Sequence, residues 1–262
     1  MAEVPSSMQR GTVYLVGAGP GDPELLTLRA ARLIGGAGLI VHDGLVDAAV
    51  LALAPQGTEL ISVAKSRARH TLPQDEINAL LVREALAGRD VVRLKGGDPF
   101  IFGRGGEEMD ACLTAGLKVE VVPGVSAAIG CAAEARLPLT HRGVSSAVTF
   151  VAGQCQGLAE QNWAGLAGSD RTLVIYMGVA SAPLIAEKLI ADGLSPDIPV
   201  AVLEKGTRSD SRVLRGSLSE LTHIIEQEQV VSPALIVIGE VASKAEGESI
   251  RQLTGWTREE AA

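Results

Sequence analysis

The feature that most limits the possible folds of this chain is a regular alternation of two patterns in its first half. Short runs of β-branched and other apolar residues, typical of buried strands, are separated by stretches with helical periodicity. The expected strands are residues 12–17, 39–42, 59–63, 90–94 and 118–122, and the expected helices are residues 27–35, 46–53, 73–87 and 106–115. This alternation predicts a parallel sheet covered by helices.

The composition and the second half of the chain complete the expected architecture. Hydrophobic residues make up 47% of the chain and aromatic residues only 3%, which indicates an aliphatic core of the kind that parallel sheets have. Further strands are expected at residues 147–151, 171–176, 199–204, 212–217 and 234–239. Because the third and fourth of these are close enough for a hairpin, the second sheet is expected to be mixed. We therefore predict two α/β domains, residues 11–123 and 124–241, with flexible or accessory ends at residues 1–10 and 242–262.

Bulk properties argue against several classes of protein. The net charge of −8 disfavours nonspecific binding of nucleic acid. Apolar runs are interrupted before the roughly 18 residues that a membrane helix needs, and the first residues lack a secretory pattern. The three cysteines, Cys112, Cys131 and Cys155, form no C-x-x-C pair, which favours free thiols over a zinc site or a disulfide framework. These features predict a cytoplasmic protein with no metal, no membrane segment and no nucleic-acid partner.

Charge is distributed unevenly along the chain. Residues 64–142 contain 11 Lys and Arg against 10 Asp and Glu, whereas the remainder contains 12 against 21. The middle of the chain is thus basic relative to its surroundings. A solvated surface can have this pattern by chance, but a basic cavity for an anionic substrate would give it a purpose, because arginine pairs with carboxylates through two hydrogen bonds.

The first glycine-rich loop, residues 17–22, follows the first expected strand and imitates a dinucleotide-binding fingerprint. That fingerprint needs G-x-G-x-x-G, but here the third glycine position is Asp22 and Pro20 stiffens the turn. A carboxylate at that place would repel a pyrophosphate. Asp43, about 20 residues further on, does imitate the ribose-binding acid. A dinucleotide-binding oxidoreductase is therefore the less favoured interpretation.

The second glycine-rich loop lies in the run Arg-Leu-Lys-Gly-Gly-Asp-Pro-Phe-Ile-Phe-Gly-Arg-Gly-Gly-Glu-Glu, residues 93–108. It begins at the carboxyl end of an expected strand, where open α/β sheets bind ligands. Gly96 and Gly97 allow a ligand to approach the backbone, and Asp98 can accept hydrogen bonds from ribose hydroxyls or attract a sulfonium. The loop exceeds the usual 2–6 residues of a βα connection, which favours a binding role.

Several motifs together give the chain a family resemblance. It resembles the tetrapyrrole methylase family, in the branch that methylates uroporphyrinogen III at carbon. The resemblance runs from about residue 11 to about residue 241 and rests on residues 16–28, 41–46, 73–78, 92–108, 122–127, 138–142 and 176–178. It implies two α/β domains with the methyl donor held in a cleft between them, and a homodimer.

The resemblance also implies a reaction. The expected activity is methylation of uroporphyrinogen III at two ring carbons to give precorrin-2, for tetrapyrroles of the sirohaem or cobalamin type. S-adenosylmethionine is the implied methyl donor and S-adenosylhomocysteine the implied product. The alternative within the same fold is a methylase of a later corrinoid intermediate, and the implied partner is in either case a small-molecule tetrapyrrole.

The positions that match the family's donor site are mostly backbone and apolar groups with one carboxylate. They are Pro20, Gly96, Gly97, Asp98, Ile101, Ser126, Ala127, Met177 and Gly206, with Ala234 as a further candidate. For Ile101 and Met177, packing in the core is an equally good interpretation, because Met commonly fills gaps in cores.

The acceptor side is expected to be basic. The candidates for binding substrate are Arg104, Glu107, His141 and Arg142. A salt bridge with a neighbouring acid is the alternative role for Arg142. The resemblance implies that Asp43 accepts the proton released after methyl transfer and that Lys65 donates one, with Arg104 near Glu107 as a rival site. Asp43 is also a candidate helix N-cap, a frequent use of Asp after a strand.

Some positions depart from the family pattern. The family has Tyr and Gly where Glu134 and Arg136 stand, and a Gln in the loop after Gly206 is replaced near Ser211. Further departures lie at residues 64–66 and 152–154. We interpret these changes as lying on the acceptor side and leaving the donor motifs intact.

Overall fold

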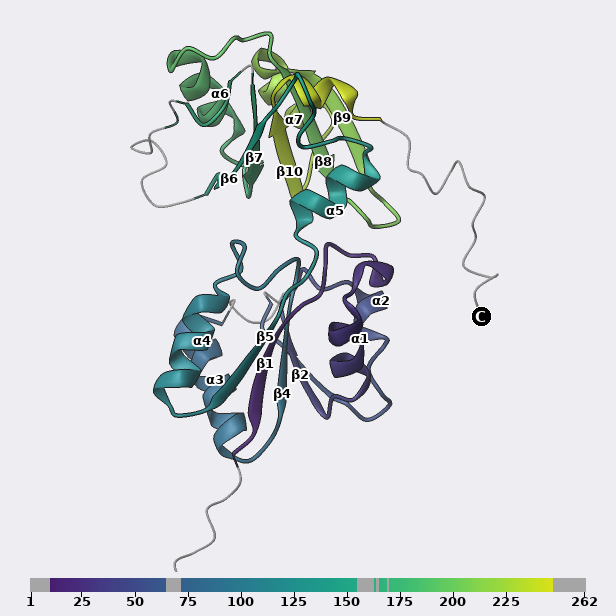
Figure 1. Ribbon diagram of the computed structural model, residues 1–262, viewed down its shortest axis with the longest axis vertical. Coiled ribbons are helices and arrows are strands. Elements are labelled where there is room, and N and C mark those ends of the chain that lie inside the picture. The colour runs from purple at the N-terminus through teal and green to yellow at the C-terminus, as the bar shows by residue number, and fades with distance from the viewer. Residues whose placement is uncertain (1–9, 65–71, 155–162, 164, 169, 247–262) are drawn as a thin grey trace, which may run out of the picture. The chain divides into compact units, whose positions relative to one another are not determined.

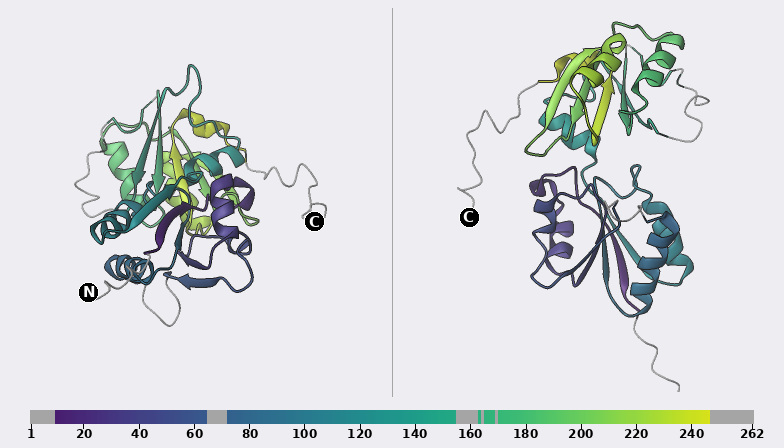
Figure 2. Two further views of the ribbon diagram at one scale, coloured as in Figure 1. Left: turned by 60° about the horizontal axis from the view of Figure 1, so that its bottom comes forward. Right: turned by 180° about the vertical axis from the view of Figure 1, so that it is seen from behind.

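The computed structural model describes residues 10–64, 72–154, 163, 165–168 and 170–246, and Figures 1 and 2 show the course of the chain. The chain divides into two compact units between Ser126 and Ala127, called here the N-terminal and the C-terminal unit. Of the expected accessory ends, residues 1–9 and 247–262 lie outside the described residues. No described helix is long and apolar enough to pass through a membrane.

The N-terminal unit contains the predicted parallel sheet. Its strands are β1 (Thr12–Gly17), β2 (Leu39–His42), β3 (Glu59–Ser62), β4 (Val91–Lys95) and β5 (Lys118–Val122). They are arranged in the order β3-β2-β4-β1-β5, and every pairing is parallel. In the dinucleotide-binding fold β1 lies directly beside β2, whereas here β4 separates them. This strand order therefore distinguishes the unit from that fold.

Helices cover both faces of this sheet (Figure 1). Helices α1 (Leu28–Gly35) and α2 (Ala48–Leu51) lie on one face, and α3 (Gln74–Leu86) and α4 (Gly105–Thr114) lie on the other. Successive residues of a strand point to opposite faces, so Leu15 of β1 joins the core with α3 and α4 while Val16 joins the core with α1 and α2. Helix α2 is shorter than the stretch 46–53 expected from the sequence.

The C-terminal unit contains the predicted mixed sheet. Its strands are β6 (Ala147–Ala152), β7 (Arg171–Tyr176), β8 (Pro199–Glu204), β9 (Arg212–Ser217) and β10 (Ala234–Ile238), in the order β6-β7-β10-β8-β9. Strands β6 and β7 are parallel, and the other pairs are antiparallel. The predicted hairpin of β8 and β9 is confirmed.

Three helices of the C-terminal unit were not predicted. Helix α5 (Ala127–Glu134) packs on one face of the sheet, and α6 (Ala182–Ala191) and α7 (Leu221–Gln227) pack on the other. Helix α5 has the sequence Ala-Ala-Ile-Gly-Cys-Ala-Ala-Glu, with its one charged residue at the last position, so it shows no polar face from which a period could be read. Short 3₁₀ turns at Pro23–Leu25, Leu218–Glu220 and Glu240–Lys244 complete the fold.

Candidate functional site

Three loops pack together at the carboxyl edge of the N-terminal sheet, after β1, β4 and β5. The Gly97 amide donates to the Gly19 carbonyl at 2.7 Å, and the Gly19 amide donates back at 3.2 Å. A Cβ on Gly124 would lie 2.2 Å from the Gly97 oxygen, and one on Gly17 would lie 2.5 Å from the Gly124 nitrogen. Only glycine fits at such a close approach. The predicted donor loop is therefore held by backbone on both sides.

Asp98 joins two of these loops. One oxygen of its carboxylate accepts the amide of Phe100 at 2.9 Å, and the other accepts the amide of Gly124 at 3.0 Å. This structural role was not foreseen from the sequence. A carboxylate offers about four acceptor positions, so Asp98 keeps the capacity to accept ligand hydroxyls. Its contact with the methyl donor stays a prediction.

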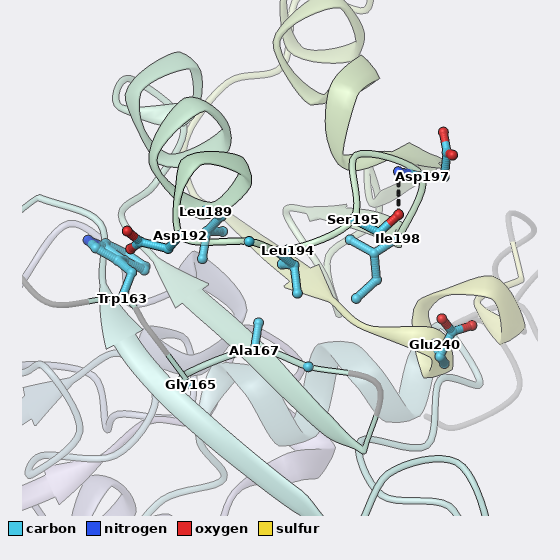
Figure 3. Close-up of a pocket in the computed structure, with 12 residues that line it drawn as sticks. Trp163, Gly165, Ala167, Leu189, Asp192, Leu194, Ser195, Asp197, Ile198 and Glu240 are labelled. Carbon is cyan, nitrogen blue, oxygen red and sulfur yellow. Dashed lines mark hydrogen bonds between the residues drawn. The ribbon is translucent and has the colours of Figure 1, made fainter.

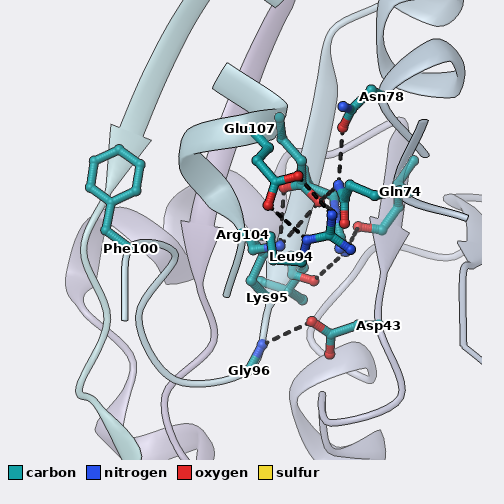
Figure 4. A network of polar contacts seen from close by, with 12 residues as sticks. Asp43, Gln74, Asn78, Leu94, Lys95, Gly96, Phe100, Arg104 and Glu107 are labelled. Carbon is teal, nitrogen blue, oxygen red and sulfur yellow. Dashed lines mark hydrogen bonds and ion pairs between the residues drawn. The ribbon is translucent and has the colours of Figure 1, made fainter. Parts of the chain in front are cut away.

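Asp43, the predicted proton acceptor, lies half-buried after β2. Its Oδ1 accepts the amide of Leu45 at 3.0 Å, and its Oδ2 is 3.4 Å from the amide of Gly96 (Figure 4). The alternative role as a helix N-cap is wrong, because Asp47 caps α2 by accepting the amide of Ala49 at 2.9 Å. Asp43 instead bridges to the donor loop. The predicted proton donor Lys65 lies outside the described residues.

Carboxylates follow three of the strands at this edge. Asp22 follows the β1 loop and caps the first 3₁₀ turn through the amide of Glu24 at 2.9 Å, while Asp43 follows β2 and Asp98 follows β4. A phosphate-bearing dinucleotide would be repelled by these groups, whereas a cationic sulfonium would be attracted. Pro20, a predicted donor-site residue, lies in the same loop as Asp22. The charges at this edge thus fit the sulfonium donor that the sequence indicated.

Arg104 and Glu107 form an exposed pair at the beginning of α4. The Arg104 guanidinium donates from Nε to Glu107 Oε1 at 2.8 Å and from a terminal nitrogen to Oε2 at 2.7 Å. This hydrogen bonding raises the pKa of Arg104 and lowers the pKa of Glu107. Arg104 has a left-handed backbone with φ of 58°, an uncommon conformation that occurs often at functional sites. The guanidinium of Arg104, which pairs here with Glu107, has the planar fork that is suited to carboxylates.

Apolar side chains lie exposed beside this pair. Phe100, Ile101 and Phe102 are 50%, 37% and 41% exposed. The alternative interpretation of Ile101 as a core residue is therefore wrong. Met177 in the C-terminal unit is likewise 44% exposed, and the same alternative fails there. Adjacent exposed apolar side chains are characteristic of ligand-binding surfaces.

A buried ionic network lies beneath the donor loop, and it was not predicted. Glu108 of α4 is fully buried and contacts Arg93 at 3.0 Å and Lys95 at 3.0 Å, both from β4. Gln74 of α3, which Figure 4 shows together with Lys95, donates to the same carboxylate at 3.3 Å. Burial, and next the charge of Arg93, lower the pKa of Lys95. The available signal was two basic residues at alternate positions of an otherwise apolar strand.

The predicted donor residues of the C-terminal unit gather at one edge of its sheet. Strand register places Tyr176, the neighbour of Met177, opposite Leu235, and places Ala234 opposite Glu204 at the end of β8. Gly206 lies two residues after the end of β8, and Ala127 begins α5 after the buried Ser126. Met177 has a left-handed backbone with φ of 55°. The antiparallel pairing thus brings Met177, Ala234 and Gly206 close together.

His141 and Arg142 lie in an exposed turn before β6. The backbone amide of His141 donates to the carbonyl of Ser145 at 3.0 Å, and the His141 Nδ1 is 3.0 Å from the Arg142 carbonyl. Within the described residues, no carboxylate forms an ion pair with Arg142, so its alternative role in a salt bridge finds no support there. Its guanidinium is exposed and available to an anionic ligand.

The C-terminal unit also contains a cavity of about 470 Å³ that is separate from these residues (Figure 3). It is lined by Trp163, Leu189 and Leu194 together with the carboxylates of Asp192 and Glu240. None of the predicted site residues lines it. Its acidic lining would repel a carboxylate-rich substrate, so this cavity does not suit the predicted acceptor.

Comparison with known proteins identifies a matching family and relatives that are longer than this chain. A family model described as Tetrapyrrole (Corrin/Porphyrin) Methylases matches residues 12–222. The siroheme synthase of Thioalkalivibrio sulfidiphilus is 49% identical over 232 residues, which are 88% of this chain and 47% of that protein. The chain spans about half the length of the curated relatives it matches.

Solved structures match over most of both chains. The native uroporphyrin III C-methyl transferase of Thermus thermophilus has a TM-score of 0.75 and 43% identity, and the match covers 88% of this chain and 93% of that one. The same values hold for that enzyme complexed with S-adenyl homocysteine. A cobalt precorrin-4 methyltransferase has a TM-score of 0.78 and 25% identity, covering 88% and 95%.

Proposed function

The chain belongs to the tetrapyrrole (corrin/porphyrin) methylase family, and on that premise we propose that it transfers methyl groups from S-adenosylmethionine to two ring carbons of uroporphyrinogen III, giving precorrin-2. The observation that carries this proposal is the 43% identity over 93% of the Thermus thermophilus methyltransferase. The precorrin-4 methyltransferase has a similar TM-score but only 25% identity. The fold therefore does not separate the two acceptors, whereas the sequence favours uroporphyrinogen III.

The proposal concerns the methyl transfer alone. The siroheme synthase relatives are about twice as long as the matched region, with 47% of the Thioalkalivibrio sulfidiphilus protein covered, but the Thermus thermophilus methyltransferase is covered almost completely. The region shared by all of these proteins is therefore the one that corresponds to the methyltransferase. Its proposed product supplies pathways to tetrapyrroles of the sirohaem or cobalamin type.

The donor edge of the N-terminal unit supports the choice of methyl donor. When bound, S-adenosylmethionine supplies an electrophilic methyl group, and transfer to a pyrrole carbon leaves one proton to be removed from the macrocycle. Asp98 accepts ribose hydroxyls in this proposal while its two amide contacts keep the loop in place. Glycine backbone on both sides allows a close approach. Positioning of the two substrates supplies most of the acceleration.

The polar groups of the acceptor side have distinct proposed tasks. Asp43 removes the proton, and its bond to the Leu45 amide and approach to the Gly96 amide orient the carboxylate. Arg142 pairs with a substrate carboxylate, with His141 beside it in the same turn. Arg104 releases Glu107 and pairs with a second carboxylate of the substrate. This exchange is possible because the side chains of Arg104 and Glu107 are both more than half exposed.

Two binding and turnover measurements test the proposal. Calorimetry is expected to give tight binding of S-adenosylhomocysteine and none of NAD. Incubation with S-adenosylmethionine is expected to change the absorption spectrum of uroporphyrinogen III but not that of a later corrinoid intermediate. Binding of NAD alone would favour an oxidoreductase, and turnover of the corrinoid alone would favour the other methylase.

The proposed enzyme works as a homodimer in the cytoplasm, with no nucleic-acid partner. The family resemblance supports the dimer, and the acidic net charge of −8 argues against nucleic acid. Light scattering after size-exclusion chromatography measures the mass directly. A mass of one chain at micromolar concentration would contradict the dimer.

A further inference from the structure

Helix α5 contacts the segments of the C-terminal unit that carry predicted donor residues. Near its first turn, the Ala128 amide donates to the hydroxyl of Tyr176, the neighbour of Met177, at 3.0 Å. In its middle, Cys131 lies directly against Gly206, where a Cβ would be 2.5 Å from the cysteine Sγ. Gly206 therefore has to be glycine for β8 and α5 to pack in this way. Helix α5 acts as a common support for both segments.

The last residue of α5 holds the loop that contains Gly206. Glu134 Oε2 accepts the backbone amide of Thr207 at 2.5 Å, and Glu134 Oε1 accepts the hydroxyl of Ser211 at 3.2 Å. One carboxylate thus fastens both ends of the connection between β8 and β9. We expected the departures at Glu134 and Ser211 on the acceptor side, but these two residues bind each other across the loop that contains Gly206, a predicted donor residue.

The backbone of this loop adopts an uncommon conformation. Lys205 and Thr207, on either side of Gly206, have left-handed φ angles of 49° and 65°. Such angles are unfavourable for residues with a side chain, most of all for a β-branched one such as threonine. They persist only where surrounding contacts enforce them. Thr207 is buried, and the hydrogen bond that its backbone amide donates to Glu134 is one of those contacts.

From this arrangement we propose that Glu134 is a positioning residue for the methyl donor, which sets the backbone of Gly206 by fastening the loop 205–211 to α5. The inference rests on the proposed function, since it assumes that Gly206 contacts the adenosyl group. Glu134 itself need not touch the donor. Its loss should therefore weaken donor binding by releasing the loop and leave acceptor binding unchanged.

Three variants separate fastening of the loop from charge and from general stability. Glu134→Ala removes both contacts. Glu134→Gln retains both, because its amide oxygen can accept from Thr207 and its amide nitrogen can donate to Ser211. Arg136→Ala is the matched control: it lies beyond the same helix end, and its side chain pairs with exposed Glu246 at 2.6 Å.

The readouts are calorimetric affinities for S-adenosylhomocysteine and for uroporphyrin III, with hydrogen exchange of the loop 205–211. Glu134→Ala should bind S-adenosylhomocysteine at least tenfold more weakly, exchange the Thr207 amide faster, and bind uroporphyrin III as the parent does. Glu134→Gln should stay within about threefold of the parent, and Arg136→Ala should bind S-adenosylhomocysteine with the affinity of the parent.

Each of the other outcomes overturns a defined part of the proposal. Parental affinity for S-adenosylhomocysteine in a folded Glu134→Ala protein refutes the positioning role while leaving the proposed function intact. Equal losses in Glu134→Gln and Glu134→Ala refute fastening of the loop as the cause. If the parent protein does not bind S-adenosylhomocysteine, the proposed function fails and the donor role of Glu134 fails with it.

Discussion

Replacing Glu108 by glutamine is expected to destabilise the N-terminal unit by about 3–5 kcal/mol, the usual cost of removing one partner from a buried ion pair. Glu108 is 0% exposed, and its partners Arg93 and Lys95 are each 3% exposed. The substitution keeps the shape of the side chain but leaves two buried cations without a counter-charge. Gln74 would still find an acceptor, so the loss is mainly electrostatic.

Lys95→Met should be much milder than Glu108→Gln. Burial and the charge of Arg93 lower the pKa of Lys95, so its charge is less favourable in the folded than in the unfolded protein, while Arg93 and Glu108 remain paired. The two changes share one network, so the double variant should be more stable, by about 0.5–3 kcal/mol, than the sum of the two single changes in unfolding free energy predicts.

The same network predicts a dependence on pH. A lysine whose folded pKa is lowered costs stability below that pKa, and the cost declines as the pH rises through it. The deficit of Glu108→Gln should therefore shrink as the pH rises through the lowered pKa of Lys95, which lies below the ordinary value of 10.5. Urea unfolding followed by circular dichroism, with hydrogen exchange of β4, measures both effects. A deficit below about 1 kcal/mol, or strictly additive variants, would refute the reasoning.

Four further predictions concern the site. Asp98→Ala should weaken donor binding by about 1–3 kcal/mol and speed exchange of the two amides that it accepts; unchanged calorimetric affinity would contradict this. Arg142→Leu should impair tetrapyrrole binding far more than donor binding, and a parallel fall in both would make the residue structural. Arg104→Lys should lower the single-turnover rate at least tenfold, or about 1.4 kcal/mol, because the planar fork is lost; a parental rate would remove it from the site. Burial raises the pKa of Cys112 to about 11 and of Cys131 to about 12, so neither should react with iodoacetamide in the folded protein at neutral pH, and rapid alkylation seen by mass spectrometry would show that burial is incomplete.

Local pattern was sufficient to predict most strands. The apolar runs of β1, β2 and β5 have the expected bounds, because parallel strands that are buried on at least one face leave a strong signature in the sequence. The hairpin of β8 and β9 followed from their short separation. Helices α5 and α6 were missed because both are apolar almost throughout, and periodicity alone cannot identify such buried segments.

Contacts between distant segments could not be predicted in this way. Glu108 meets Lys95 only because α4 packs on the sheet that contains β4, and Glu134 meets Ser211 only because the loop after β8 folds over α5. Asp43 shows the same limit: an Asp after a strand suggested a cap, but that task belongs to Asp47, four residues later. Motifs indicated which segments are candidates for binding ligand, whereas tertiary packing decides which contacts each side chain makes there.

Transfer of a labelled methyl group is the decisive test of uroporphyrinogen III as the acceptor. The protein is incubated with methyl-labelled S-adenosylmethionine and uroporphyrinogen III under anaerobic conditions, and the macrocycle is analysed by mass spectrometry. We expect two labelled methyl groups per macrocycle, both on ring carbons, and one S-adenosylhomocysteine for each methyl group transferred. A macrocycle without label, in a preparation that binds S-adenosylhomocysteine, would contradict uroporphyrinogen III as the acceptor.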